Sequence, residues 1–116
     1  MSLEHWTLNG HETVRGASLQ EWGRMFDDME ARRVAQTKIG GWNVSTVFIG
    51  IDHNFGAWPP LLFETMAFSH HEPRNEHDEE CWRYTTWEEA EQGHAAIVAW
   101  LTADPAANSE PPDVGS

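Results

Sequence analysis

Polar residues that could do chemistry gather where an apolar run of the chain ends. The segment "IDHNFG" at 51–56 places Asp52, His53 and Asn54 directly after a stretch of β-branched residues. A carboxylate, an imidazole and an amide can bind a ligand or move a proton. Asp and Asn side chains also bond the local backbone and open turns. The triplet therefore predicts either an ordinary turn or the edge of a site. Asp52 and His53 can share a site only if the strand has already ended, because neighbouring strand residues point to opposite faces.

His94 is a second candidate, on the apolar stripe of a predicted C-terminal helix and next to Gly93. Glycine inside a helix costs about 1 kcal/mol relative to alanine. We therefore expect another part of the molecule to approach this helix closely. His94 is then either a core residue hydrogen-bonded to its neighbours or a side chain that points into a pocket.

The histidine-rich segment "SHHEPRNEHDEE" at 69–80 contains residue types that bind metals. Its spacing matches no zinc signature, and adjacent His70 and His71 point apart in an extended chain. We expect a solvated loop here, with no metal site and no cofactor; a weak, adventitious metal site is the alternative.

Catalytic motifs are absent from the sequence. There is no G-x-S-x-G, no P-loop, no H-E-x-x-H and no cysteine pair. Cys81 falls in a predicted core strand, where a thiol is usually inert. An enzyme remains the principal alternative, in the form of a small metal-dependent or acid–base catalyst that uses Asp52, His53 and His94.

Aromatic and basic residues suggest a binding surface. Most of the seven tryptophans should be core residues, but Trp58 lies in a Gly-Ala-Trp-Pro-Pro loop near Phe55 and could stack on a base or a partner. Arg32, Arg33 and Lys38 form a local basic cluster that could hold an anion. The residues that we predict to bind a ligand or partner are Asp52, His53, Asn54, Phe55, Trp58, His94 and Arg33.

The overall charge restricts the kind of partner. The 116 residues carry a net charge of −12, with seven Lys and Arg against nineteen Asp and Glu. This balance argues against direct binding to a DNA backbone, which needs Lys and Arg. It suits a basic partner, such as the nucleic-acid groove of another protein, or serves solubility alone.

The sequence also indicates where the protein works. No apolar run is long enough to cross a membrane, and the N-terminus lacks the pattern of a signal peptide. A single cysteine suits a reducing compartment. We therefore expect a cytoplasmic protein.

The elements that must position these residues can be read from local signals. Asn9-Gly10 is a two-residue turn signal. Ser18 with Glu21, and Thr86 with Glu89, have the spacing of helix capping boxes. The predicted elements in chain order are a hairpin over 3–17, a helix over 18–35, strands over 42–52, 61–69 and 81–85, and a helix over 86–103.

This order, ββαβββα, predicts an α+β fold: a small antiparallel β-sheet with two helices packed on one face. Residues 1–103 are expected to form a single globular domain, followed by a disordered tail over 104–116. A short sheet with free edges also makes a homodimer plausible.

Two stretches resemble a group of small proteins from tailed phages and prophages. The first is "VSTVFIGIDHNFGAWPPLLFETMAF" at 44–68, and the second is "RYTTWEEAEQGH" at 83–94. The group shares a pattern close to V-S-T-V-F-L-G-L-D-H-x-F, P-L-L-F-E-T-M and R-Y-x-T-W-E-E-A-x-x-G-H. The N-terminal third is less similar. The resemblance implies a phage or prophage origin and implies no activity.

Taken together, these features favour a phage-encoded binding protein without catalytic activity. We expect a counter-defence factor that occupies a host defence protein or sequesters a nucleotide second messenger in the bacterial cytoplasm. The alternatives are the enzyme described above and an accessory protein of phage assembly or structure.

Overall fold

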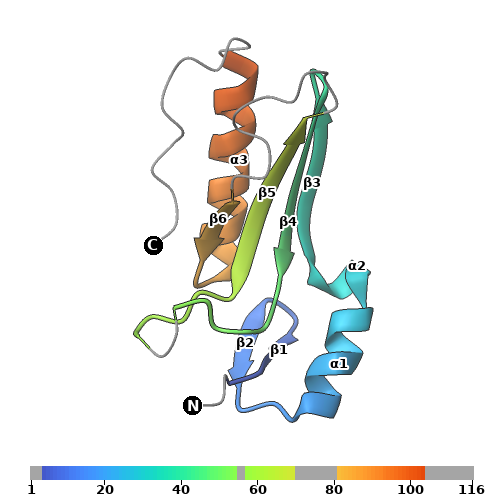
Figure 1. Ribbon diagram of the computed structural model, residues 1–116, viewed down its shortest axis with the longest axis vertical. Coiled ribbons are helices and arrows are strands. Elements are labelled where there is room, and N and C mark those ends of the chain that lie inside the picture. The colour runs from blue at the N-terminus through green and yellow to red at the C-terminus, as the bar shows by residue number, and fades with distance from the viewer. Residues whose placement is uncertain (1–3, 55–56, 70–80, 104–116) are drawn as a thin grey trace.

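The computed structural model describes residues 4–54, 57–69 and 81–103 (Figure 1). Helices and antiparallel strands share this part of the chain, which confirms the predicted α+β class. The elements in chain order are β1 (Trp6–Asn9), β2 (Glu12–Arg15), α1 (Leu19–Asp27), α2 (Met29–Arg32), β3 (Arg33–Ile39), β4 (Trp42–Phe48), β5 (Phe63–Ser69), β6 (Cys81–Tyr84) and α3 (Trp87–Ala103).

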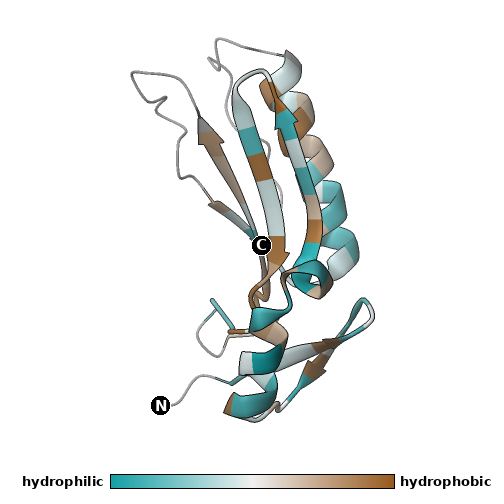
Figure 2. Cartoon of the chain, turned by 90° about the vertical axis from the view of Figure 1, so that its right-hand side faces the viewer, coloured by the Kyte–Doolittle hydropathy of each residue, from teal (hydrophilic) through white to brown (hydrophobic). Residues whose placement is uncertain are grey.

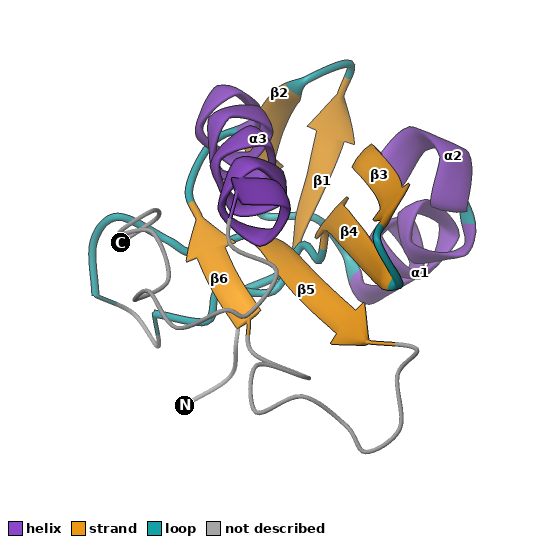
Figure 3. Ribbon diagram, turned by 90° about the horizontal axis from the view of Figure 1, so that it is seen from above, coloured by secondary structure: helices purple, strands orange, loops and turns teal. Residues whose placement is uncertain are grey.

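A four-stranded sheet in the order β3-β4-β5-β6 forms the centre of the fold, and every pair in it is antiparallel. Helix α3 packs on one face and contacts all four strands (Figure 3). Burial alternates along β4, where Trp42, Val44, Thr46 and Phe48 are buried and the residues between them are half-buried. This period of two places one face of the sheet under α3, and α3 leaves the other face uncovered.

The N-terminal hairpin is a separate two-stranded sheet at one end of the molecule (Figure 1). Its tip differs from expectation by one residue: Asn9 pairs with Glu12, so the turn consists of Gly10 and His11, and Gly10 has a φ of 65°. Helix α1 contacts β1 of this hairpin. The expectation of two helices on one face of a single sheet is therefore corrected, since α3 covers the large sheet and α1 packs on the hairpin.

The expected helix over 18–35 is two helices separated at Asp28, and the helical part ends at Arg32 instead of Ala35. The Ser18–Glu21 capping box starts α1 as predicted, but α1 ends at Asp27. Asp28 then accepts a hydrogen bond from the Ala31 backbone N–H and caps the single turn of α2. The chain enters β3 at Arg33, so the element order is ββααββββα instead of ββαβββα.

The missed strand, β3, pairs with β4 through a tight Gly40-Gly41 turn in which both glycines have positive φ. Two glycines between two short polar–apolar runs are a hairpin signal. The apolar residues Leu19, Trp22, Met25, Phe26 and Met29 follow a helical spacing, and Arg33, which is not apolar, falls on the same spacing. The sequence therefore does not mark the point where the helical period gives way to that of a strand.

The remaining elements agree with expectation, with shorter strands. Strand β4 ends at Phe48, because Gly50 bends the chain with a φ of 71°. Strands β5 and β6 lie within the predicted ranges. The Thr86–Glu89 capping box is present at the start of α3. The predicted tail over 104–116 lies outside the described residues.

Cys81 departs from its expected place. It belongs to β6, which is the edge strand opposite β3, and its side chain is exposed instead of buried in the core. Within the described part of the chain, no helix has the length and apolar character needed to cross a membrane.

Candidate functional site

The Asp52–Asn54 triplet holds its own loop in place. Asp52 Oδ1 accepts hydrogen bonds from the backbone N–H groups of Asn54, at 2.7 Å, and Leu61, at 3.0 Å. His53 Nδ1 donates to the Ile51 carbonyl at 2.9 Å. Asn54 Nδ2 donates to the Pro59 carbonyl at 2.7 Å. The triplet therefore performs turn chemistry, which was one of the two interpretations of this sequence.

The aromatic part of the predicted loop site is only partly described. Trp58 is 76% exposed and precedes a cis peptide bond to Pro59. Phe55 lies outside the described residues, so the predicted pairing of these two rings has no structural account. Trp58 is available for contact with a partner, and its role stays a prediction.

The basic cluster predicted around Arg32, Arg33 and Lys38 is divided by the structure. Arg32 is 5% exposed, and its Nε and Nη1 atoms donate to the carbonyls of Phe48, at 2.9 Å, and Phe26, at 2.8 Å. Its guanidinium carbon lies 4.0 Å from the centre of the Phe26 ring. Burial lowers the pKa of Arg32. Arg32 therefore ties α1 and α2 to the end of β4.

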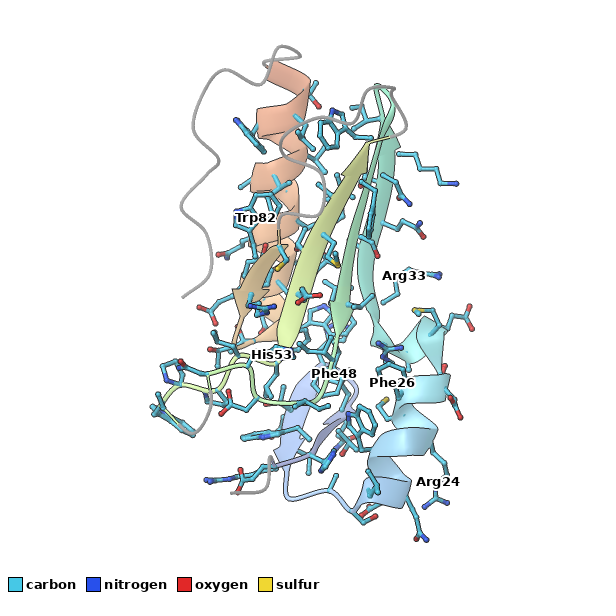
Figure 4. The ribbon with its side chains drawn as sticks, in the orientation of Figure 1. Arg24, Phe26, Arg33, Phe48, His53 and Trp82 are labelled. Atoms are coloured by element: carbon cyan, nitrogen blue, oxygen red, sulfur yellow. The ribbon has the colours of Figure 1, made fainter. Side chains whose placement is uncertain are left out.

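Arg33 and Lys38 remain exposed on β3. Figure 4 shows Arg33 projecting outward beside β3, well apart from His53 in the loop after β4. The structure thus separates the described site residues into three places: Asp52, His53, Asn54 and Trp58 lie in the chain between β4 and β5, Arg33 lies on β3, and His94 lies on the sheet-facing side of α3.

The sheet face that α3 leaves uncovered is a further candidate for a binding surface, and the strand register shows which residues belong to it. Residues paired across antiparallel strands share a face, so the register identifies this face from the half-buried positions of β4. We call it the open sheet face. Its residues are Arg33, Gln36 and Lys38 of β3, Asn43, Ser45 and Val47 of β4, Glu64, Met66 and Phe68 of β5, and Cys81 and Arg83 of β6.

The open sheet face is basic, although the whole chain is strongly acidic. Among the described residues it carries Arg33, Lys38 and Arg83 against a single carboxylate, Glu64. Arg83 Nε donates to Glu64 Oε2 at 3.0 Å, which leaves the two β3 cations without a carboxylate partner on that face. Like charges at both margins of a sheet create a local positive potential that attracts anions.

The centre of the same face is less polar. Val47, Met66 and Phe68 are half-buried on adjacent strands β4 and β5. Gln36 Nε2 donates to Asn43 Oδ1 at 3.2 Å between the β3 and β4 rows. The face therefore combines an apolar middle with cationic margins.

His94 is the centre of a buried hydrogen-bond chain that runs beneath α3 from one edge strand to the other. Its Nε2 lies 2.8 Å from Thr37 Oγ1 in β3, and its Nδ1 lies 2.8 Å from Thr46 Oγ1 in β4. Thr46 Oγ1 contacts Thr65 Oγ1 of β5 at 2.5 Å, and the Tyr84 hydroxyl of β6 donates to Thr65 at 3.0 Å.

One proton arrangement satisfies every group of this chain. Tyr84 donates to Thr65, Thr65 donates to Thr46, Thr46 donates to His94 Nδ1, and His94 Nε2–H donates to Thr37. His94 is neutral in this arrangement. Burial lowers the pKa of His94 and raises that of Tyr84 to about 12. Both shifts favour the neutral forms that the chain requires.

His94 fits the interpretation of a core residue that is hydrogen-bonded to its neighbours. It is 5% exposed and bonded on both ring nitrogens, as a core histidine is. It also lines a groove of about 540 Å³ between β3 and α3. We call this the β3–α3 groove; its lining residues are Thr37, His94, Ala95, Val98, Ala99 and Thr102.

The close approach expected at Gly93 is that of Tyr84. A Cβ atom at Gly93 would fall on the phenol ring of Tyr84. The glycine therefore admits the last member of the hydrogen-bond chain beneath the helix.

The positions of His53 and His94 give no catalytic arrangement in support of the enzyme alternative. The two ring nitrogens of His94 are both engaged by threonines of β3 and β4, while His53 bonds within its own loop. In the part of the chain that is described, no group of three or more His, Cys, Asp or Glu side chains is arranged to hold a metal ion. The histidine-rich segment over 70–80 lies outside that part.

Sequence reasoning missed Arg83 and the threonines Thr37, Thr46 and Thr65. Side chains alternate between the two faces of a strand, so the spacing of apolar residues along 42–48 and 63–69 could have placed Thr46 and Thr65 on the buried face. The face on which Arg83 lies follows from the register of β6, and the position of Thr37 follows from the existence of β3. Both depend on the pairing of strands.

Comparisons with protein-family models, with curated proteins and with solved structures found no match.

Proposed function

We propose that this protein is a non-catalytic binding protein that takes an anionic ligand of the nucleotide class on its open sheet face. In this proposal it is a phage-encoded counter-defence factor that sequesters a nucleotide second messenger in the bacterial cytoplasm. The phage origin rests on the sequence resemblance at 44–68 and 83–94.

The observation that carries the proposal is the placement of positive charge. Arg33, Lys38 and Arg83 lie on one face of the sheet in a chain of net charge −12. An anion approaching an acidic protein is repelled over most of the surface, so a cationic face directs it to one place.

The apolar middle of the face supports a nucleotide over a simple inorganic anion. Phe68 and Met66 offer a surface on which a base can stack, while Arg and Lys side chains at the margins can contact phosphates. The ligand in this proposal is bound without turnover, since the proposed contacts supply no nucleophile or general base.

Occupation of a host defence protein is the second candidate, and exposed apolar side chains favour it. Leu19, Phe26 and Met29 are 66%, 43% and 45% exposed on α1 and α2, and Trp58 is 76% exposed. Large exposed apolar residues that gather on neighbouring elements mark protein contact sites. An accessory role in phage assembly would use the same surface with a virion partner.

A thermal-shift screen against nucleotides and cyclic oligonucleotides tests the proposal. A ligand at 100 times its Kd stabilises the folded state by about 2.7 kcal/mol, which raises the Tm of a domain of this size by several degrees. The double variant Lys38→Gln/Arg83→Gln should abolish the shift. The matched control is Arg24→Gln, which removes an exposed arginine of α1 and should keep the shift.

The contrary results are equally specific. No shift with any nucleotide, or a shift that the double variant keeps, would reject the open sheet face as the nucleotide site. A shift with divalent metals alone would revive the enzyme alternative.

A further inference from the structure

Strand β3 is a free edge of the large sheet. Among the described residues it pairs with β4 on one side and with no other strand on the other side. An edge strand presents unpaired backbone N–H and C=O groups along its outer side. β3 is seven residues long; it has a bulge between Arg33 and Ala35, and the Arg33 N–H donates to the Met29 carbonyl, so its regular part from Ala35 to Ile39 is the length that can pair with an added strand.

The β3–α3 groove runs beside this edge. Its helix wall consists of small side chains, Ala95, Ala99 and Thr102, which are exposed, and of Val98, which is half-buried. Small residues on the wall leave room for side chains that come from outside. The groove, about 540 Å³ in volume, is shallow and open to solvent along the edge.

Hydrophilic and hydrophobic residues follow one another along β3, as the coloured bands of Figure 2 show, and the register assigns them to two different faces. Ala35, Thr37 and Ile39 share the face of β4 that lies under α3, and each is half-buried. Arg33, Gln36 and Lys38 belong to the open sheet face and are exposed. From Ala35 to Ile39 a strand added to this edge would continue both rows, because its side chains alternate with the same period; the bulge between Arg33 and Ala35 interrupts that period at the start of β3.

We propose that the edge of β3 binds an extended segment of a partner protein, in which apolar and acidic residues alternate, as an additional antiparallel or parallel strand. The apolar residues of the segment occupy the β3–α3 groove beside Val98 and Ala99. The acidic residues lie next to Arg33 and Lys38 on the other face. The backbone of the segment pairs with the free N–H and C=O groups of β3, which is the strand-addition mode of peptide recognition.

Charge selects this occupant over a second copy of the chain. Two β3 strands brought together edge to edge would place Arg33 and Lys38 of one copy beside the same cations of the other, inside an assembly with twice the negative net charge. An acidic segment instead meets two cations that, among the described residues, have no carboxylate partner on their face. Opposite charges across paired strands stabilise the pairing, and like charges destabilise it.

This site is separate from the proposed nucleotide surface, although both use Lys38. The peptide needs the β3–α3 groove and has no use for Arg83 on the far edge strand β6. The nucleotide needs the open sheet face and has no use for Ala99. Variants of Ala99 and Arg83 therefore distinguish the two proposals.

The test uses a fluorescently labelled synthetic peptide of alternating aspartate and valine, as long as β3, with the full-length protein. Fluorescence polarisation should show saturable binding, and hydrogen exchange should slow at the backbone amides of β3. A peptide of alternating lysine and valine is the charge control. A copy of the first peptide with N-methylated backbone amides is the control for strand pairing, and neither control peptide should bind.

Variants of the protein locate the binding. Ala99→Trp fills the groove, and Lys38→Glu reverses the charge at the edge. Each should weaken the binding of the peptide by about tenfold or more. Arg83→Gln should leave peptide binding unchanged, and Arg24→Glu is the matched charge reversal away from the edge. Far-UV circular dichroism and Tm establish that each variant is folded.

Three results would overturn the proposal. The first is equal binding of the acidic and basic peptides. The second is peptide binding that survives both Ala99→Trp and Lys38→Glu in folded variants. The third is a dimer in light scattering whose β3 amides are already protected without peptide, because a second copy would then occupy the edge.

Discussion

Gly93 of α3 leaves no room for a side chain, because a Cβ atom there would overlap the ring of Tyr84 in β6. Tyr84 is 1% exposed, and its hydroxyl donates to Thr65. The contact fixes how closely α3 approaches the sheet, and with it the positions of His94 and the β3–α3 groove.

Gly93→Ala should therefore destabilise the protein despite the better helix propensity of alanine. Propensity favours alanine by about 1 kcal/mol, whereas an extra group forced into a packed core costs about 1–3 kcal/mol. We expect a net loss in the free energy of unfolding, measured by urea denaturation. Gly23→Ala is the matched control in α1, because nothing lies within 4 Å of the added Cβ; it should be neutral or stabilising. Equal changes in the free energy of unfolding for Gly93→Ala and Gly23→Ala would contradict the proposed role of the contact between Gly93 and Tyr84.

Acid should weaken the fold through His94. The pKa of His94 is lowered by burial in the folded state and returns to an ordinary value of about 6.5 in the unfolded chain. Above that value both states are neutral and the fold has its full stability. As the pH falls below it, the unfolded chain takes up the proton first, so stability declines until the pH reaches the lowered pKa.

The measurement for His94 is urea denaturation between pH 7.5 and pH 5, which are values of about one unit or more on either side of the ordinary histidine pKa. His94→Gln keeps a donor and an acceptor but does not titrate, so it should lose part of this pH dependence. An unchanged slope in His94→Gln would show that other groups cause the acid sensitivity.

Arg32 should contribute to stability and not to ligand binding. Arg32→Met removes the donors to the Phe48 and Phe26 carbonyls, and an unsatisfied buried polar group costs about 1–3 kcal/mol. Arg33→Met, at the neighbouring exposed position, should change stability by no more than about 0.5 kcal/mol. Chemical denaturation of both variants measures the free energy of unfolding. An Arg32→Met variant as stable as the original protein would refute the structural role of Arg32.

Asp52 should act as a loop clamp. Asp52→Ala frees the Asn54 and Leu61 amides, and a loss of about 1–3 kcal/mol is expected because the Leu61 site is buried. Asp52→Asn keeps an acceptor oxygen and should retain most of the stability. If Asp52→Ala instead left Tm unchanged and removed ligand binding, the triplet would be the edge of a site after all.

The sequence predicts those parts of the site that depend on residues close together in the chain, and it does not predict those that depend on residues far apart. Ser18–Glu21 and Thr86–Glu89 are local signals, and the structure contains both capping boxes. The turn chemistry of Asp52 and Asn54 is nearly local and was one of two stated interpretations. Arg32 and Arg33, adjacent in the sequence, have opposite environments that no local signal distinguishes, since burial depends on where β4 ends.

The sequence by itself determined the α+β class, the helix starts and the strand-rich middle of the chain, because these follow from capping, turn residues and side-chain period. Tertiary structure decided that 33–39 is a strand, since β3 exists by pairing with β4. It also decided which strand residues share the open sheet face and which threonines meet His94. Those groupings arise from register and packing between segments far apart in the chain, and such contacts have no signature in any single stretch.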